Sequence, residues 1–101
     1  MSLTLGDAQH LTWKTYKKLE KMNEDRALQI SSPISLARKA DEIMKKFGTL
    51  QNSRSSENVQ AFSNGLSQLL FSMFVLAESG GVSLEDSFLQ AVDELILEFV
   101  T

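Results

Sequence analysis

The 101-residue chain contains no cysteine, one histidine, one proline and no long apolar run. The absence of cysteine excludes disulfides, thiolate catalysis, zinc fingers and iron–sulfur clusters, and it is compatible with the reducing cytoplasm in which we expect the protein to reside. His10 has no partner at the spacing of a metal-ligand pair, so we place it on the surface rather than in a metal or catalytic site. The sequence also lacks a glycine-rich phosphate loop and a Ser-His-Asp or Cys-His set.

Neither charge nor hydropathy favours a nucleic acid or a membrane as partner. The net charge is −3 and the pI is about 5.0, whereas phosphate backbones require a concentrated basic surface. The lysines between residues 14 and 21 are diluted by acidic neighbours, which indicates a solvated helix face. The longest apolar run, residues 69–77, is interrupted by Ser72 and is far shorter than the roughly 20 residues that span a bilayer. The amino terminus does not have the pattern of a secretory signal.

The apolar spacing predicts one all-α domain, residues 1–101, with four helices and no strand. We expect Asp7 to cap the first helix, which ends near residue 23 and turns residues 8, 11, 19 and 22 inward. Residues 26–31 are expected to form a loop. Ser32 and Pro33 then begin a second helix that runs to residue 47, where Gly48 stops it. Residues 49–56 read as a flexible surface loop.

The stretch 59–99 predicts a helical hairpin. Apolar residues recur every three or four positions from Val59 to Ala77, and two glycines end this third helix. Ser83 and Asp86 have the spacing of a capping box for the fourth helix. Both helices are apolar on more than one side, which exceeds what a lone four-helix unit can bury. We therefore expect a homodimer or tetramer that buries them.

Four segments of the chain share a family pattern: Ser32-Pro33, Leu36-x-x-x-Ala40-x-Glu42-Ile43, Leu66-Ser67-Gln68-Leu69-Leu70-Phe71 and Gly81-Val82-Ser83-Leu84-Glu85-Asp86. From about residue 26 to residue 99 the sequence resembles the MazG-like all-α nucleoside triphosphate pyrophosphatases. The resemblance implies a four-helix fold that assembles into dimers or tetramers. In that family, an EExxE motif on the second helix and an ExxD motif on the third hold magnesium against a nucleoside triphosphate, which is split into a monophosphate and pyrophosphate.

At the positions of these motifs the chain has lost most of the carboxylates. Arg38 and Lys39 replace the first two glutamates, and only Glu42 matches. Gly65 and Gln68 stand where the third helix of the family carries its glutamate and aspartate. Magnesium prefers carboxylate and other oxygen ligands, and a cation about 4 Å from Glu42 would offset roughly 4 kcal/mol of its attraction at an effective dielectric constant of 20. We therefore expect no standard metal-dependent catalysis and no cofactor.

The end of the fourth helix departs from the family in the opposite sense. Where the family often carries lysine and arginine for the phosphates, this chain has Glu94 and Glu98. Together with Arg38 and Lys39, this pattern predicts an inversion of charge across one cleft, with a cation and a carboxylate in salt-bridge reach within the chain or across a dimer. The alternative interpretation is that all four are solvated surface charges.

Two hypotheses for the function follow. The first is a non-catalytic helical dimer that acts through protein contacts or as a nucleotide-binding relic. The second is a divergent magnesium-dependent pyrophosphohydrolase, a house-cleaning enzyme for nucleotides, that recruits Asp41, Glu42 and acids of the fourth helix. Trp13 and Tyr16 fit packing better than stacking on a base. A polar strip on the third helix fits an interhelical seam or contacts to a small ligand: Ser63, Asn64, Ser67, Gln68 and Ser72.

Overall fold

The computed structural model describes residues 2–100, which form five helices and no strand. The helices are α1 (Leu5–Met22), α2 (Glu24–Ser31), α3 (Pro33–Asn52), α4 (Ser56–Ser79) and α5 (Leu84–Val100). The all-α class is confirmed, but the expected count of four helices is wrong because the predicted loop at residues 26–31 is helical. Asn23 ends α1, and its side-chain oxygen accepts from the Arg26 amide, so the same residue caps α2.

Local hydrogen bonds set the starts of the first long helices. Thr4, not Asp7, caps α1: its hydroxyl accepts from the Asp7 amide at 3.0 Å, and the Asp7 carboxylate accepts from the Thr4 amide at 3.3 Å. Asp7 is therefore the second partner of a capping box rather than the cap. Ser32 caps α3 as predicted, since its hydroxyl accepts from the Ser35 amide.

The expected stop at Gly48 is wrong, because α3 continues to Asn52. Gly48 does not have the left-handed conformation of a helix-ending glycine; among the described residues only Gly81, with φ 69°, has a positive φ. The predicted surface loop shrinks to residues 53–55. Phe47, the last residue of the predicted helix, lies beside Phe62 of α4 with ring centroids 5.4 Å apart, so this part of α3 packs against α4.

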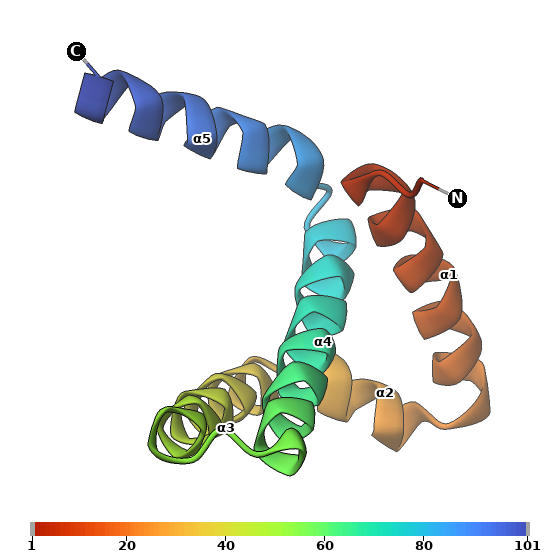
Figure 1. Ribbon diagram of the computed structural model, residues 1–101. Coiled ribbons are helices and arrows are strands. Elements are labelled where there is room, and N and C mark those ends of the chain that lie inside the picture. Colours follow the sequence, from red (N-terminus) through yellow and green to blue (C-terminus); the bar gives the residue numbers. More distant parts are fainter. Residues whose placement is uncertain (1, 101) are drawn as a thin grey trace.

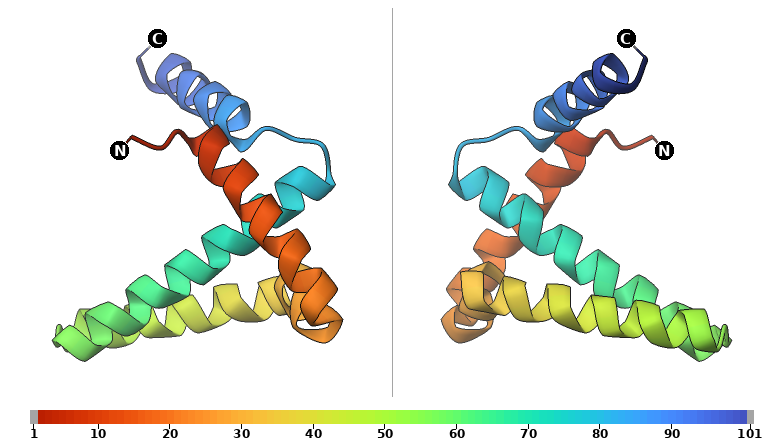
Figure 2. Two further views of the ribbon diagram at one scale, coloured as in Figure 1. Left: turned by 90° about the vertical axis from the view of Figure 1, so that its right-hand side faces the viewer. Right: turned by 90° about the vertical axis from the view of Figure 1, so that its left-hand side faces the viewer.

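Helix α4 is the centre of the structure and contacts α1, α2 and α3 (Figure 1). From their shared turn, α3 and α4 spread apart like the arms of a V (Figure 2). By length and composition α4 could cross a membrane, a weak indication that the core helix of a soluble protein also gives. Its central place in the packing is what the sequence predicted for this segment.

The small core lies where α1, α2 and α4 meet. Tyr16, Ala27 and Val75 are buried there, and three further apolar side chains pack around them: Trp13, Ile30 and Phe71. Trp13 and Tyr16 therefore belong to the core. The predicted inner stripe of α1 is wrong at two of its four residues, since Leu11 is 56% exposed and Met22 is 84% exposed, while residues 8 and 19 are half-buried.

The turn between α4 and α5 is held by glycine and by a buried side chain of α1. Gly81 adopts the left-handed conformation after the end of α4, and the Ser83 hydroxyl accepts from the Asp86 amide as predicted. Gln9, which is 6% exposed, donates to the Val82 carbonyl at 2.8 Å and accepts from the Leu84 amide at 2.9 Å. Helix α1 thus fixes the direction in which α5 leaves.

Helix α5 projects from the end of α4 and contacts α1 near its own start (Figure 1). The radius of gyration is 15.9 Å, whereas a compact chain of this length has a value of about 13 Å. The accessible surface is 7594 Å². A monomer of this mass exposes roughly 5,700 Å², so about 1,900 Å² is surplus. The single chain therefore leaves more surface open than folded monomers do.

Candidate functional site

Four of the residues selected from the sequence line one cavity. Arg38, Lys39 and Glu42 of α3 meet Gln68 of α4 around a volume of about 210 Å³, together with Gln29 and Ser35. A second cavity, of about 280 Å³, shares Gln29, Lys39 and Gln68 with the first. Its other lining residues are Arg26, Ile30, Phe71 and Ser72. We call the two adjoining cavities the α2–α3–α4 cleft.

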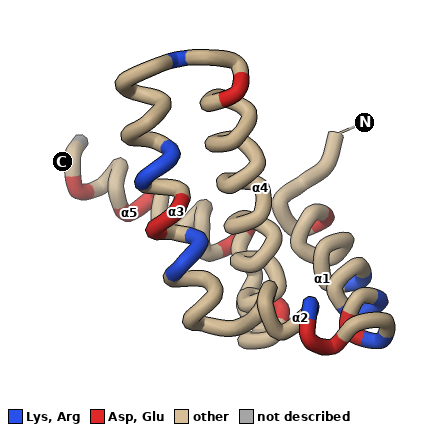
Figure 3. The backbone as a smooth tube through the Cα atoms, turned by 90° about the horizontal axis from the view of Figure 1, so that it is seen from below, with Lys and Arg blue, Asp and Glu red and all other residues tan. Residues whose placement is uncertain are grey.

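Lys39 is the best-anchored cation of the cleft. Its Nζ donates to the hydroxyl of Ser72 at 3.1 Å, and Ser72 is fully buried. Burial lowers the pKa of Lys39, the charge of Arg26 lowers it further, and Glu42 acts in the opposite direction. Two like charges therefore lie near one another at this wall of the cleft. Figure 3 shows basic and acidic residues interleaved along α3.

The carboxylate of Glu42 faces no second acid across the cleft. The α4 residue that lines the same cavity is the neutral Gln68, and Asp41 forms an exposed ion pair with Lys45 at 3.1 Å. Within residues 2–99, whose side chains are described, no group of three or more histidine, aspartate or glutamate residues is placed to hold a metal. The set Asp41, Glu42 and α5 acids proposed for a divergent enzyme does not converge within one chain.

Gly65 lies outside both cavities, at the contact between α3 and α4. It is buried, and a Cβ atom added there would lie 3.0 Å from Cγ1 of Ile43. To admit a Cβ, the Ile43 side chain would have to give by a few tenths of an ångström. The close packing of α3 against α4 thus favours glycine at this position.

Glu94 and Glu98 lie on α5, which leaves α4 at the end opposite to α3 (Figure 1). The ion pairs among the described side chains are Lys17–Glu20 and Asp41–Lys45, so the charge pairing with Arg38 or Lys39 is not made within one chain. Glu94 instead accepts from the side-chain amide of Gln90 at 3.2 Å. A pairing across a dimer remains a prediction.

The predicted polar strip of α4 divides between two faces. Gln68 and the buried Ser72 line the cleft, while three exposed members lie outside it: Ser63, Asn64 and Ser67. The exposed members bond along their own helix, with Ser67 donating to the carbonyl of residue 63 and Asn64 accepting from Gln60. His10 is exposed as expected.

Arg26 and Gln29 of α2, and Gln9 of α1, were missed in the sequence. The signal for the first two was Asn23 followed by Arg26, Gln29 and Ile30, a cap and one face of a short helix. For Gln9 no local signal exists, because its partners lie more than 70 residues away.

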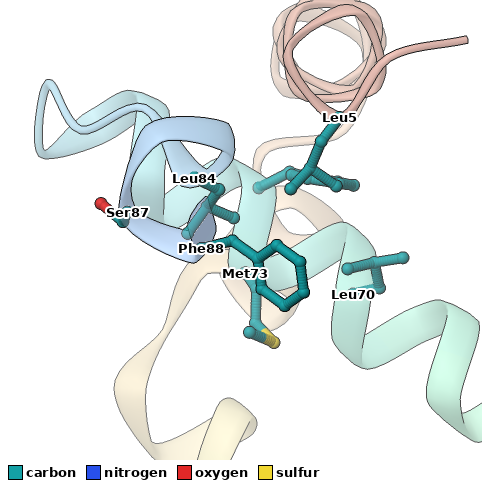
Figure 4. Close-up of a pocket in the computed structure, with 7 residues that line it drawn as sticks. Leu5, Leu70, Met73, Leu84, Ser87 and Phe88 are labelled. Atoms are coloured by element: carbon teal, nitrogen blue, oxygen red, sulfur yellow. The ribbon is translucent and has the colours of Figure 1, made fainter. Parts of the chain in front are cut away.

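A third cavity, apolar and of about 460 Å³, lies at the corner between α1, α4 and α5. Leu5, Leu70, Met73 and Phe88 point into a common space, while the hydroxyl of Ser87 points away from it (Figure 4). Phe88 is nevertheless 61% exposed. This apolar corner is therefore open to solvent and only half enclosed by its own chain.

Comparison with protein-family models, with curated proteins and with solved structures finds no match to this chain. The functional assignment therefore depends on the α2–α3–α4 cleft and on the apolar corner.

Proposed function

We propose that the protein is a degenerate MazG-like homodimer that has no metal-dependent pyrophosphatase activity and acts through binding. The loss of activity is supported by the single carboxylate of the cleft, Glu42, which shares its cavity with Arg38 and Lys39. A metal must be fixed by several ligands before it can polarise a phosphoryl oxygen. In this chain the cation-rich wall repels a metal instead.

The main observation that supports a dimer is the surplus of exposed surface on the single chain. A standard interface buries about 800 Å² per partner and larger homodimers bury about 1,000–2,500 Å², so the surplus of roughly 1,900 Å² is the size that a dimer covers. The exposed apolar side chains concentrate on α4 and α5: Leu66, Leu70, Met73, Leu76, Phe88, Leu89, Leu95, Ile96, Leu97 and Phe99. A second copy is the partner that supplies an apolar surface of equal size by two-fold symmetry.

Charge supports a particular arrangement of the two copies. Helix α5 carries five carboxylates and no cation, whereas α3 carries four cations and two carboxylates. Packing α5 against its own equivalent would bring like charges together. Packing it over α3 and α4 of the other copy brings opposite charges together, which places Glu94 and Glu98 within range of the basic residues of α3.

Sedimentation equilibrium of the wild type and of a Phe88→Ser variant tests the dimer. We expect twice the chain mass of 11.3 kDa at tens of micromolar for the wild type, and a weakened association for the variant because it removes the aromatic side chain of the apolar corner. Gln90→Ser, an exposed polar position on the same helix, is the matched control and should associate like the wild type. A wild-type monomer at these concentrations would refute the proposal.

A nucleotide assay tests the loss of catalysis. Release of pyrophosphate from common nucleoside triphosphates should stay at background with magnesium or manganese. Turnover that disappears in Glu42→Gln would instead establish the divergent pyrophosphohydrolase. The two assays are independent, since a dimer without turnover supports the proposal and a dimer with turnover supports the alternative.

A further inference from the structure

We propose that the larger cavity of the α2–α3–α4 cleft is a metal-independent oxyanion site that takes a phosphate group. Every residue of this cavity comes from one chain, so the site is formed without a second copy, and a carboxylate of α5 that reached Lys39 across a dimer would compete with the phosphate. Two of the lining residues, Lys39 and Gln68, stand at positions where the pyrophosphatase motifs carry a carboxylate.

The lining of this cavity supplies hydrogen-bond donors and no carboxylate. Arg26 and Lys39 bring positive charge, and the side chains of Gln29, Gln68 and Ser72 add amide and hydroxyl donors. Ile30 and Phe71 provide an apolar wall on one side. Charge-assisted hydrogen bonds to a phosphate oxygen are stronger than those between neutral groups, and guanidinium groups bind phosphate in a bidentate geometry.

Lys39 and Arg26 both keep side-chain N–H groups that can donate to an anion. Lys39 donates to Ser72, so its ammonium group retains two further N–H groups. The guanidinium of Arg26 makes no hydrogen bond or ion pair with the side chains of residues 2–99. An anion between these groups would relieve the repulsion that helps to lower the pKa of Lys39.

Size and charge restrict the ligand to one phosphate group. A volume of about 280 Å³ lies at the lower limit of small-molecule sites, which span roughly 300–1,000 Å³. The adjoining cavity is smaller, about 210 Å³, and its carboxylate, Glu42, lies beside Arg38 and Lys39, so it offers a second phosphate less net positive charge than the larger cavity does. Inorganic phosphate and phosphate monoesters therefore fit better than diphosphates or triphosphates.

Calorimetric titration in the presence of EDTA tests the site with inorganic phosphate, adenosine monophosphate and adenosine triphosphate. We expect saturable binding of the first two and weaker binding of the triphosphate. Lys39→Gln and Arg26→Gln should each weaken phosphate binding by about tenfold, since each removes one charge-assisted contact. Tighter binding of the monophosphate than of phosphate would show that the ligand is an ester, and equal binding would show recognition of the free group.

Lys45→Gln is the matched control, because it removes the same charge from an exposed position of α3 that is paired with Asp41. It should change phosphate binding by less than about twofold, since exposed charges are screened by salt. Circular dichroism reports whether each variant is folded, and Lys39→Arg, which keeps the charge, should retain binding if Lys39→Gln is unstable. Equal losses in Lys39→Gln and Lys45→Gln, or a titration without saturation, would overturn the proposal.

Discussion

Replacement of Gly48 by alanine decides whether α3 passes through this position, and we expect it to stabilise the protein. Gly48 lies in the helix interior, its φ is not positive, and no atom comes within 4 Å of an added Cβ. Alanine favours a helix interior over glycine by about 0.8–1.0 kcal/mol. Because no contact opposes the change, the free energy of unfolding should rise by nearly this amount.

Thermal unfolding followed by circular dichroism measures this gain. For a domain of about 100 residues, 1 kcal/mol raises Tm by roughly 4–8 °C. Wild type and variant are compared at equal protein concentration, since association also shifts Tm. Gly81→Ala is the matched control: at φ 69° alanine should cost about 1–2 kcal/mol.

The opposite result for Gly48→Ala would refute the helix continuation. If α3 ended at Gly48 in a left-handed conformation, as the sequence pattern suggested, alanine would destabilise the protein in the manner of Gly81→Ala. A lower Tm for both variants would therefore place the end of α3 at Gly48, while a higher Tm for Gly48→Ala alone confirms the longer helix.

Three further predictions concern the cleft and the α4–α5 turn. Gly65→Glu introduces the glutamate that the pyrophosphatase motif carries at this position. It should lower the free energy of unfolding by about 1–3 kcal/mol in urea denaturation, because Ile43 lies 3.0 Å from the added Cβ. Unchanged stability would contradict the close contact. Gln9→Ala should cost about 1–2 kcal/mol and speed hydrogen exchange of the Leu84 amide, and exchange at the wild-type rate would rule out the clamp. The pKa of Lys39 is lowered in the folded state, so the unfolded state binds more protons between this lowered pKa and 10.5. The stability of wild type relative to Lys39→Gln should therefore rise with pH through this window, and a pH-independent difference would contradict it.

Helix formation was determined largely by local sequence. The Ser32 cap with Pro33, the glycine turn after α4 and the Ser83 cap depend on groups within about five residues of one another, and all three were predicted. The same reasoning failed for α2, because residues 24–31 carry too few apolar side chains to show a period. It also failed at Gly48, where a glycine that can end a helix lies instead in the helix interior without a positive φ.

The candidate site, like the fold, was predictable from the sequence only in part. The absence of carboxylates at positions 38, 39, 65 and 68 was visible in the residue types, so the expectation of no standard metal-dependent catalysis rested on the sequence alone. The α2 wall of the cleft, with Arg26 and Gln29, required the fold, because α2 reaches α3 and α4 only through packing. The packing role of Gly65 likewise depends on the distance between two helices.

The sequence by itself determined that the chain is helical, acidic and too apolar along its last two helices to bury them alone. Tertiary structure decided which face of each helix is buried and where α5 points. The leucines of α1 carry the stronger apolar signal, yet its inner face contains Gln9, Thr12 and Tyr16. One reason is that the buried side chain of Gln9 supplies hydrogen-bond partners to the carbonyl of residue 82 and the amide of residue 84. Such a pairing between distant residues has no periodicity along the chain, so only the folded structure reveals it.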